Sequence, residues 1–183
     1  MKRLEKVALL TVLIEKLHAK GSWCGETHIQ KTVYFGQELL EIPMEFKFIL
    51  YKHGPFSFDL RNELTEMQAD GLLESETKTP LYGASLILTN RGKSIQKSYN
   101  NVITDYKEKL NFIVDELGGK NVIELERLAT ALYIKIKHSD EDDNSIAERI
   151  NTIKPHILIS DAKNAVMELN KIMSEVGSIS IEP

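Results

Sequence analysis

Two histidines in this chain have neighbours that could take part in chemistry. His53 lies in the run YKHGP at residues 51–55, and an imidazole can act as a general base because it ionises near neutral pH. Cys24 precedes His28 by four residues, a separation that a Cys-His nucleophile could have at the start of a helix. No nucleophile or second base stands at a suggestive spacing from His53. We therefore interpret His53 as a structural residue of the turn and Cys24 as a small buried hydrophobe.

One acidic loop has the spacing of a calcium site, with Asp140, Asp142 and Asn144 at alternate positions. An EF-hand loop also needs glycine at its sixth position and a bidentate glutamate at its twelfth, where this chain has Ser145 and Asn151. The five histidines and the single cysteine show no paired zinc-ligand spacing, and no glycine-rich phosphate loop occurs. The sequence thus predicts no catalytic residue, no metal and no cofactor, which indicates a protein that is not an enzyme.

The first 93 residues predict three helices and a hairpin. Thr27 and Gln30 form a capping box for the second helix, and Ser57 can cap the third, which Gly71 ends. The expected elements are helices over 2–20, 27–42 and 57–70, a strand over 46–51, and hairpin strands over 72–77 and 86–88. This order is typical of a winged helix-turn-helix.

Residues 94–183 continue with helices. Apolar residues recur at steps of three and four from Thr89 to Leu117, which indicates one long helix whose seam needs a partner helix, in the chain or in a second copy. Further helices are expected to begin at the capping boxes Asn121-Glu124 and Ser145-Glu148 and at Ser160. We therefore expect an α+β, mostly helical protein, with a winged-helix-like core over 1–93 and a C-terminal helical extension over 94–183, packed as one compact domain.

The turn at residues 53–55 has a structural explanation. Pro55 fixes its own backbone angle and keeps Gly54 away from the helical region, while glycine accepts backbone angles that other residues resist. The turn is therefore expected to end the preceding strand and to orient the next helix. Phe56 and Phe58 would then anchor the start of that helix in the core.

Several short runs together resemble a known family. They are Ile29-Gln30-Lys31 with Val33-Tyr34-Phe35, the turn Tyr51-Lys52-His53-Gly54-Pro55-Phe56-Ser57, and the late Lys154-Pro155-His156. On these residues the chain is similar to the uncharacterised prokaryotic YwgA-type family and, more distantly, to the Panacea antitoxin domain. The resemblance implies a winged-helix-like core with a helical extension. It also implies a regulatory or adaptor role, since the Panacea relatives include antitoxins and adaptors that hand a toxin to a protease.

Charge and cysteine content limit the partners and the compartment. Residues 1–93 hold 12 basic and 12 acidic residues, so the whole net charge of −4 falls on residues 94–183. Nonspecific binding to nucleic acid depends on Lys and Arg displacing counterions, so this charge balance weakens that hypothesis. A single cysteine favours a reducing cytoplasm, and no apolar run approaches the ~20 residues that span a bilayer. We expect a cytoplasmic protein without a membrane segment.

The leading functional hypothesis is a non-enzymatic regulatory or antitoxin-like adaptor that binds another protein. The third helix carries four acidic residues against one arginine, a charge of −3 that phosphates would repel. An acidic helix beside aromatic residues suits a protein partner, because aromatic anchors supply much of the binding energy of protein interfaces. The candidate partner-binding residues are Tyr51, His53, Phe56 and Arg61.

The alternative hypothesis is a winged-helix transcriptional regulator that contacts DNA mainly through its hairpin, the wing. Lys78 lies near the expected tip of the hairpin and Arg91 and Lys93 lie just after it, and these three are the candidate nucleic-acid contacts. Such a regulator would form a homodimer through the long helix over 90–117. An enzyme centred on His53 is a third hypothesis, which a pocket bringing another polar group to His53 would favour.

Overall fold

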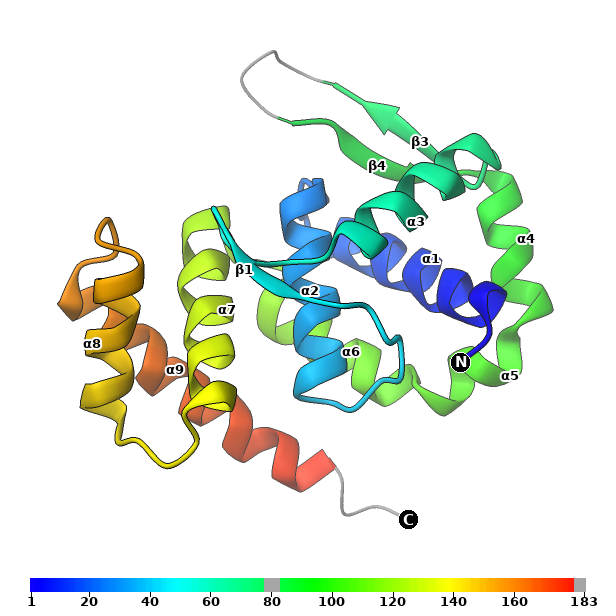
Figure 1. Cartoon of the computed structure of the whole chain (residues 1–183). Helices are drawn as coiled ribbons and strands as arrows, with labels where there is room; N and C mark the ends of the chain where they lie inside the picture. The colour runs from blue at the N-terminus through cyan, green and yellow to red at the C-terminus, as the bar shows by residue number, and fades with distance from the viewer. Residues whose placement is uncertain (78–82, 180–183) are drawn as a thin grey trace. The chain divides into compact units, whose positions relative to one another are not determined.

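The structure, a computed structural model, describes residues 1–77 and 83–179 (Figure 1). Over these residues the protein is α+β and mostly helical, with two small antiparallel hairpins, which confirms the expected fold class at that level. Contacts divide the chain into two compact units. Unit 1 comprises Met1–Phe48 and Ser57–Lys120, and unit 2 comprises Ile49–Phe56 and Asn121–Pro183. The boundary expected at 93/94 falls inside a helix of unit 1 in this division.

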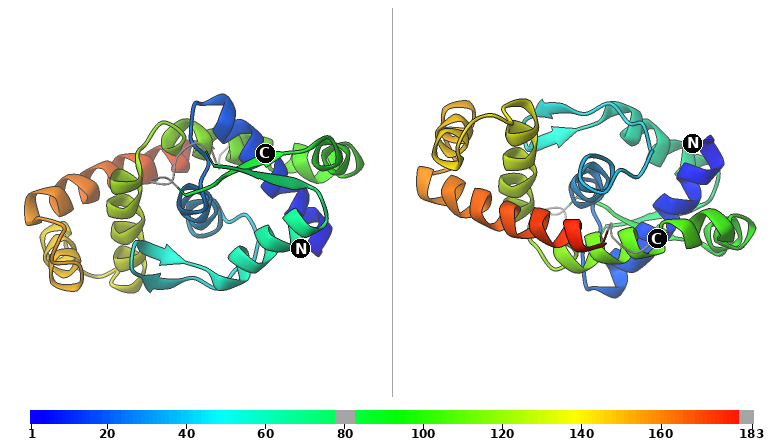
Figure 2. Two further views of the ribbon diagram at one scale, coloured as in Figure 1. Left: turned by 90° about the horizontal axis from the view of Figure 1, so that it is seen from above. Right: turned by 90° about the horizontal axis from the view of Figure 1, so that it is seen from below.

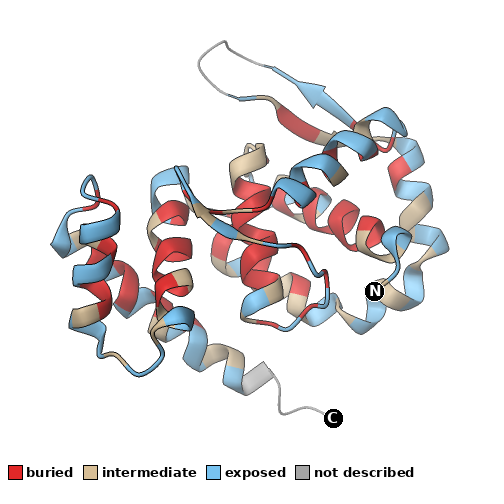
Figure 3. Ribbon diagram, viewed as in Figure 1, coloured by how far each residue is buried: buried red, intermediate tan, exposed pale blue. Residues whose placement is uncertain are grey.

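Unit 1 is built around its first helix. Its elements are α1 (Arg3–Ala19), α2 (Glu26–Glu38), α3 (Phe58–Ala69), β3 (Leu73–Glu76), β4 (Ser85–Leu88), α4 (Asn90–Ser98), α5 (Asn100–Asp105) and α6 (Lys107–Leu117). Every residue of α1 from Val7 to Ile14 is buried (Figure 3). A helix that is apolar on all sides must be covered on all sides, and here α4, α5, α6 and β4 contact it.

The order of three helices and a hairpin in unit 1 agrees with the expected order. The Ser57 hydroxyl caps α3 as predicted, accepting a hydrogen bond from the backbone N–H of Leu60 at 3.2 Å. β3 and β4 pair in antiparallel register. Phe58, expected in the core, is instead 46% exposed at the start of α3. The winged-helix assignment itself stays a prediction.

Two glutamines of α2 hold the backbone on both sides of residues 49–56. The side-chain amide of Gln37 donates to the carbonyl of Phe46 at 3.0 Å, and its oxygen accepts from the N–H of Phe46 at 2.8 Å. Gln30 makes the same two hydrogen bonds with Ser57, each 2.9 Å long. The glutamines are seven residues apart and therefore lie on one face of the helix. Through them, α2 fixes the two points where the chain leaves and re-enters unit 1.

Two expectations about the helices of unit 1 are wrong. α2 begins directly after Gly25, which offers no side-chain cap, so the capping box expected from Thr27 does not form. The long helix is interrupted at Tyr99 and Tyr106 and becomes α4, α5 and α6. Its buried seam residues in α6 are Leu110, Ile113, Val114 and Leu117. Because α6 contacts α1 and α2, this part of the seam has its partner helices within the chain, and a homodimer through residues 90–117 stays a prediction.

Unit 2, over its described residues, consists of three helices and the inserted hairpin. Its elements are β1 (Ile49–Tyr51), β2 (Gly54–Phe56), α7 (Val122–Lys137), α8 (Asp143–Ile153) and α9 (Ile159–Ile179). α7 contacts α8, α9 and β2, and both views of Figure 2 show the hairpin beside α7. Asn121 and Glu124 form the expected capping box. The other two expected caps are wrong, because Asp142 rather than Ser145 caps α8, and Ser160 already lies inside α9.

Candidate functional site

The His-Gly-Pro stretch belongs to a tight hairpin in unit 2. β1 and β2 pair in antiparallel register, and Lys52 and His53 form the turn between them. Gly54 has a φ of +85°, a left-handed conformation that glycine adopts without strain. The strand expected over 46–51 is β1, over Ile49–Tyr51, and it ends at the turn as expected. The sequence did not predict that Gly54 and Pro55 begin a second strand before α3. A two-stranded hairpin tolerates this proline because such a sheet has only edge strands.

A buried glutamate on α7 lies beneath the turn of this hairpin. The side chain of Glu126 is only 10% exposed, yet three nitrogen-bearing side chains surround its carboxylate. The Oε1 atom is 3.1 Å from Nε2 of His156 and 3.3 Å from Nζ of Lys154. The Oε2 atom is 3.5 Å from Nδ1 of His53. Burial of a lone carboxylate would be strongly unfavourable, so these neighbours are what allow a charge at this position.

Lys154 ties the hairpin turn to the end of α8. Its side chain is 7% exposed, and its ammonium group donates to the backbone carbonyls of Tyr51, at 2.7 Å, and Lys52. The contact with Glu126 occupies the third of the three donors that a lysine ammonium has. All three donors of the Lys154 ammonium are therefore occupied by acceptors in unit 2. It fixes the position of the turn and neutralises the buried carboxylate at the same time.

The electrostatics of this cluster keep Glu126 ionised. Burial by itself would raise the pKa of Glu126, but the ammonium of Lys154 and the imidazole of His156 outweigh it and hold that pKa below its ordinary value. At neutral pH, Glu126 and Lys154 thus form a buried ion pair without net charge. The two imidazoles lie at its solvent side, with side chains 57% exposed for His53 and 60% exposed for His156.

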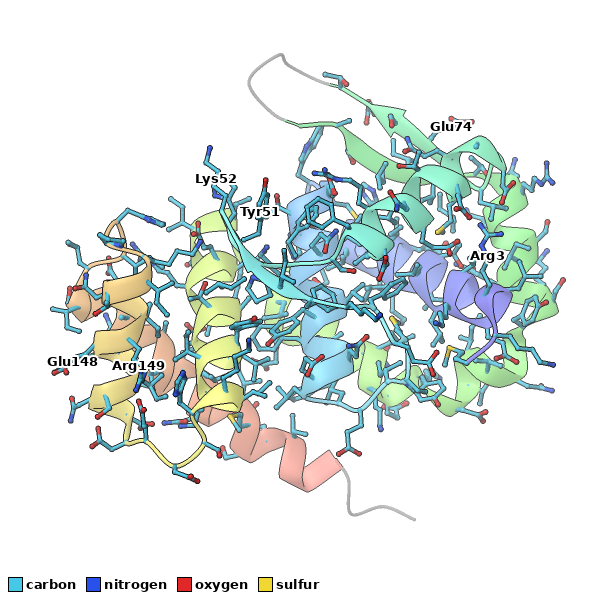
Figure 4. The ribbon with its side chains drawn as sticks, viewed as in Figure 1. Arg3, Tyr51, Lys52, Glu74, Glu148 and Arg149 are labelled. Atoms are coloured by element: carbon cyan, nitrogen blue, oxygen red, sulfur yellow. The ribbon has the colours of Figure 1, made fainter. Side chains whose placement is uncertain are left out.

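A pocket of about 560 Å³ opens beside this cluster. It is lined by residues 50–53 of the hairpin and by residues 153–156 at and after the end of α8, and we call it the hairpin pocket. Its apolar lining includes Tyr51 and Ile153, which are 52% and 48% exposed. Figure 4 shows Tyr51 and Lys52 at the tip of the hairpin. The pocket therefore combines an exposed aromatic ring with a lysine and two imidazoles.

The structure brings together only some of the residues selected from the sequence. Tyr51 and His53 both line the hairpin pocket, and the ring of Phe56 lies 5.7 Å from that of Tyr51, centroid to centroid. Arg61 is elsewhere, on α3 of unit 1, where its Nε donates to Glu26 at 2.9 Å. Three of the four candidate partner-binding residues thus belong to one hairpin.

The candidate nucleic-acid contacts are less well grouped. Lys78 lies outside the described residues. Arg91 is exposed in the first turn of α4, and the ammonium of Lys93 is 3.9 Å from a carboxylate oxygen of Glu15. The carboxylates of Glu63 and Glu66 on α3 and of Asp70 directly after it all lie within 3.5 Å of the Arg3 guanidinium. Because a single arginine forms ion pairs with three carboxylates, the surface of α3 keeps an excess of negative charge.

Sequence reasoning missed three members of the site. Lys154 and His156 were noticed only as part of a resemblance, and Glu126 was not noticed at all. One signal existed for Glu126: it precedes Ala129 by three residues and therefore lies on the same side of α7 as this apolar residue. A charged residue at such a position indicates a buried partner. No pattern in the sequence indicates that this partner is Lys154, which lies 28 residues later in the chain.

The Cys-His hypothesis for Cys24 and His28 is contradicted by the geometry. The Nδ1 atom of His28 bonds to the hydroxyl of Ser22 at 2.8 Å, and Nε2 donates to the carbonyl of Leu117 at 3.0 Å. Cys24 is buried, and its burial raises the pKa of the thiol to about 12. A thiol that stays protonated is a poor nucleophile. Both residues are structural parts of unit 1.

The hairpin pocket itself offers limited chemistry. An imidazole held by a buried carboxylate is oriented well enough to take a proton from water. The lining residues 50–53 and 153–156 include no serine, threonine or cysteine that an imidazole could activate. Among the residues that the structure describes, no group of three or more His, Cys, Asp and Glu side chains is placed to hold a metal ion.

Comparison with known proteins gave no assignment. A scan against models of protein families and a search of curated proteins both found no match for this chain. Within residues 1–77 and 83–179, no helix is long and apolar enough to cross a membrane. The resemblance to the YwgA-type and Panacea families therefore stays a prediction.

Proposed function

We propose that this protein is a non-enzymatic, cytoplasmic regulatory adaptor that binds another protein through the hairpin pocket. The observation that carries the proposal is a hairpin, tied to Lys154, that places an exposed aromatic ring at a pocket. Tyr51, the ring concerned, is the residue type that most often anchors protein interfaces. Its own backbone carbonyl accepts from the buried Lys154, so the anchor is held in place before a partner arrives.

The distribution of exposed apolar residues supports unit 2 as the binding unit. Large apolar side chains that are exposed to solvent favour a protein interaction when they are numerous and close to a polar rim. Unit 2 is the smaller unit, yet it carries most of those among the described residues. Unit 1 has Leu4 and Phe58, whereas unit 2 has Ile49, Tyr51, Val122, Ile123, Ile136, Ile153, Leu158, Ile159, Met167 and Met173.

A binding experiment with matched aromatic variants tests this proposal. Purified proteins encoded by neighbouring genes are titrated against the full chain and its variants by isothermal calorimetry. Tyr51→Ala should weaken binding by about 2 kcal/mol, roughly thirtyfold, if Tyr51 is an anchor. Phe58→Ala is the control, because Phe58 is a similarly exposed ring in unit 1. Equal loss in the two variants, or no loss with Tyr51→Ala, would contradict the assigned site.

DNA binding through the region after the wing is the second candidate function. The exposed guanidinium of Arg91 at the start of α4 favours it, and the acidic surface of α3 opposes it. Duplex retardation on a gel that disappears in Arg91→Ala/Lys93→Ala and weakens steeply with salt would support this candidate. Retardation that persists in the double variant would count against it.

An enzyme centred on His53 is the third candidate. The polar group that this hypothesis required is present, because Glu126 lies 3.5 Å from His53 at the edge of a pocket. A hydrolysis of activated esters that follows the charge state of an imidazole and is lost in His53→Gln would support it. Turnover no faster than that of the His53→Gln variant would exclude general-base catalysis by this residue.

A further inference from the structure

We propose that the hairpin pocket binds an acidic segment of the partner protein, in which a carboxylate side chain is followed by an apolar one. This inference rests on the proposed adaptor function and adds the chemistry of the partner. The carboxylate would be held by Lys52, His53 and His156, and the apolar side chain would pack against Tyr51 and Ile153.

The first argument is the charge that faces the pocket. The hairpin contributes Lys52 and His53, the segment after α8 contributes Lys154 and His156, and α7 contributes Glu126 below them. Glu126 and Lys154 neutralise one another as a buried pair. The lining residues 50–53 and 153–156 include no acidic residue. Apart from the phenol of Tyr51, the remaining titratable side chains of the lining are a lysine and two imidazoles. A bound segment would complement them by carrying carboxylates.

The second argument is the orientation of the two imidazoles. Each directs one ring nitrogen at a different oxygen of Glu126: Nδ1 in His53 and Nε2 in His156. A histidine has two ring nitrogens, and both donate when the imidazole is protonated. In the protonated imidazoles, the opposite nitrogens, Nε2 of His53 and Nδ1 of His156, are therefore the donors that remain for a second carboxylate. Because both side chains are more than half exposed, an incoming group can reach them.

The third argument is the apolar surface beside these donors. Tyr51 and Ile153 line the same pocket and are each about half exposed. A small anion such as inorganic phosphate would leave this surface uncovered. A nucleic acid backbone would need several lysines or arginines to replace its counterions, and Lys52 is the exposed one in this lining. A peptide that presents a carboxylate beside a leucine or an isoleucine uses both parts of the pocket.

Peptides of matched length test the inference. The probes are a decapeptide of alternating Glu and Leu and its counterpart with Gln in place of Glu, each with a neutral fluorescent label, and binding is followed by anisotropy. The Glu peptide should bind about tenfold tighter than the Gln peptide, because the carboxylate makes charge-assisted hydrogen bonds. The preference should shrink between 50 mM and 500 mM NaCl, where exposed charges are screened. Equal affinities for the two peptides would overturn the inference.

Variants show whether the preference arises in the pocket. His53→Gln/His156→Gln should reduce the Glu-over-Gln preference from about tenfold to about twofold. Lys52→Gln, in an exposed turn residue that folding does not need, should reduce it to about threefold and keeps the test valid if the double variant unfolds. His138→Gln is the matched control, because His138 also faces a glutamate, Glu141 at 3.5 Å, away from the pocket. A preference that survives in the double variant and in Lys52→Gln would overturn the inference.

The outcome also separates this inference from the proposed function. If Tyr51→Ala abolishes binding of a partner protein while the Glu and Gln peptides bind equally, the adaptor function stands and the acidic chemistry is wrong. If duplex DNA binds the protein in a Lys52-dependent manner and neither peptide does, both are wrong.

Discussion

Unit 1 and unit 2 each hold histidine beside a polar cluster, but the two units use it differently. In unit 1, His28 is buried and bonds only to neutral groups, the hydroxyl of Ser22 and the carbonyl of Leu117. In unit 2, His53 and His156 are exposed and share a charged partner, Glu126. A buried imidazole with both nitrogens satisfied holds elements together. An exposed imidazole with one nitrogen left over can also bind a ligand.

The largest effect expected concerns the buried ion pair of unit 2. Lys154→Met removes the ammonium that neutralises Glu126 and holds the hairpin turn. The free energy of unfolding should fall by about 3 kcal/mol, because a buried carboxylate loses its main partner. Urea unfolding followed by circular dichroism measures this change. The control is Lys135→Met, which removes a more exposed ion pair with Asp143 at 2.8 Å and should cost less than about 1 kcal/mol.

A double variant sharpens that result. Lys154→Met/Glu126→Leu removes both charges and should be more stable than Lys154→Met alone, since no unpaired carboxylate stays buried. A double variant that is less stable than the single one would show that Lys154 acts mainly through the carbonyls of Tyr51 and Lys52.

The neutral cluster of unit 1 should be the next most sensitive. His28→Leu removes two hydrogen bonds from a buried position, one with the hydroxyl of Ser22 and one with the carbonyl of Leu117. The expected loss is about 2 kcal/mol in the free energy of unfolding, against about 0.5 kcal/mol for His53→Leu at an exposed position. Equal losses in the two variants would contradict the distinction between the clusters.

The two clusters should also respond to acid in different pH ranges. Burial lowers the pKa of His28 in the folded protein below 6.5. As the pH falls, the unfolded chain therefore binds its proton at a higher pH than the folded protein does. The free energy of unfolding decreases as the pH falls from 6.5 through the pKa of the folded state. The pKa of Glu126 is below its ordinary 4.5, so its contribution is present above 4.5 and is lost as the pH falls further. Urea midpoints measured from pH 8 to pH 3 report both losses. In His28→Gln, only the loss that begins near pH 6.5 should disappear.

The smallest effect is expected at Cys24, beside the cluster of unit 1. The thiol is buried and its pKa is raised to about 12, so it should react with a disulfide reagent at pH 8 only when the protein opens. Labelling in native buffer should be far slower than in urea. Rapid labelling of the native protein would show that the surroundings of His28 are open to water.

Local signals in the sequence predicted much of the helical framework. Ser57 and Asn121 cap helices where expected, because a cap depends on contacts only two or three residues away. Thr27 and Ser145 failed as caps because each helix begins less than one turn earlier than the pattern implied, after Gly25 and Asp142. The apolar seam of the long helix was recognised, but its breaks at Tyr99 and Tyr106 have no clear signal in the periodicity.

The site was less accessible to sequence reasoning, since it depends on contacts between distant residues. The hairpin was singled out in the sequence because a His-Gly-Pro run is conspicuous, and its part in binding a partner stays a prediction. Its second strand was missed because proline is usually read as the end of a strand. Lys154 reaches the carbonyl of Tyr51 from 103 residues away, and no local pattern encodes such a bond.

The insertion of residues 49–56 into unit 2 determines the order in which this protein can be assembled. A ribosome makes the hairpin more than 60 residues before it makes α7, so the hairpin cannot be completed when it emerges. Meanwhile Gln37 and Gln30 can already hold the chain at Phe46 and Ser57, which keeps the loop ends together until Glu126 and Lys154 are synthesised. A nascent chain halted at Lys120 would therefore display an unfinished loop, and translation itself would delay the completion of the hairpin pocket.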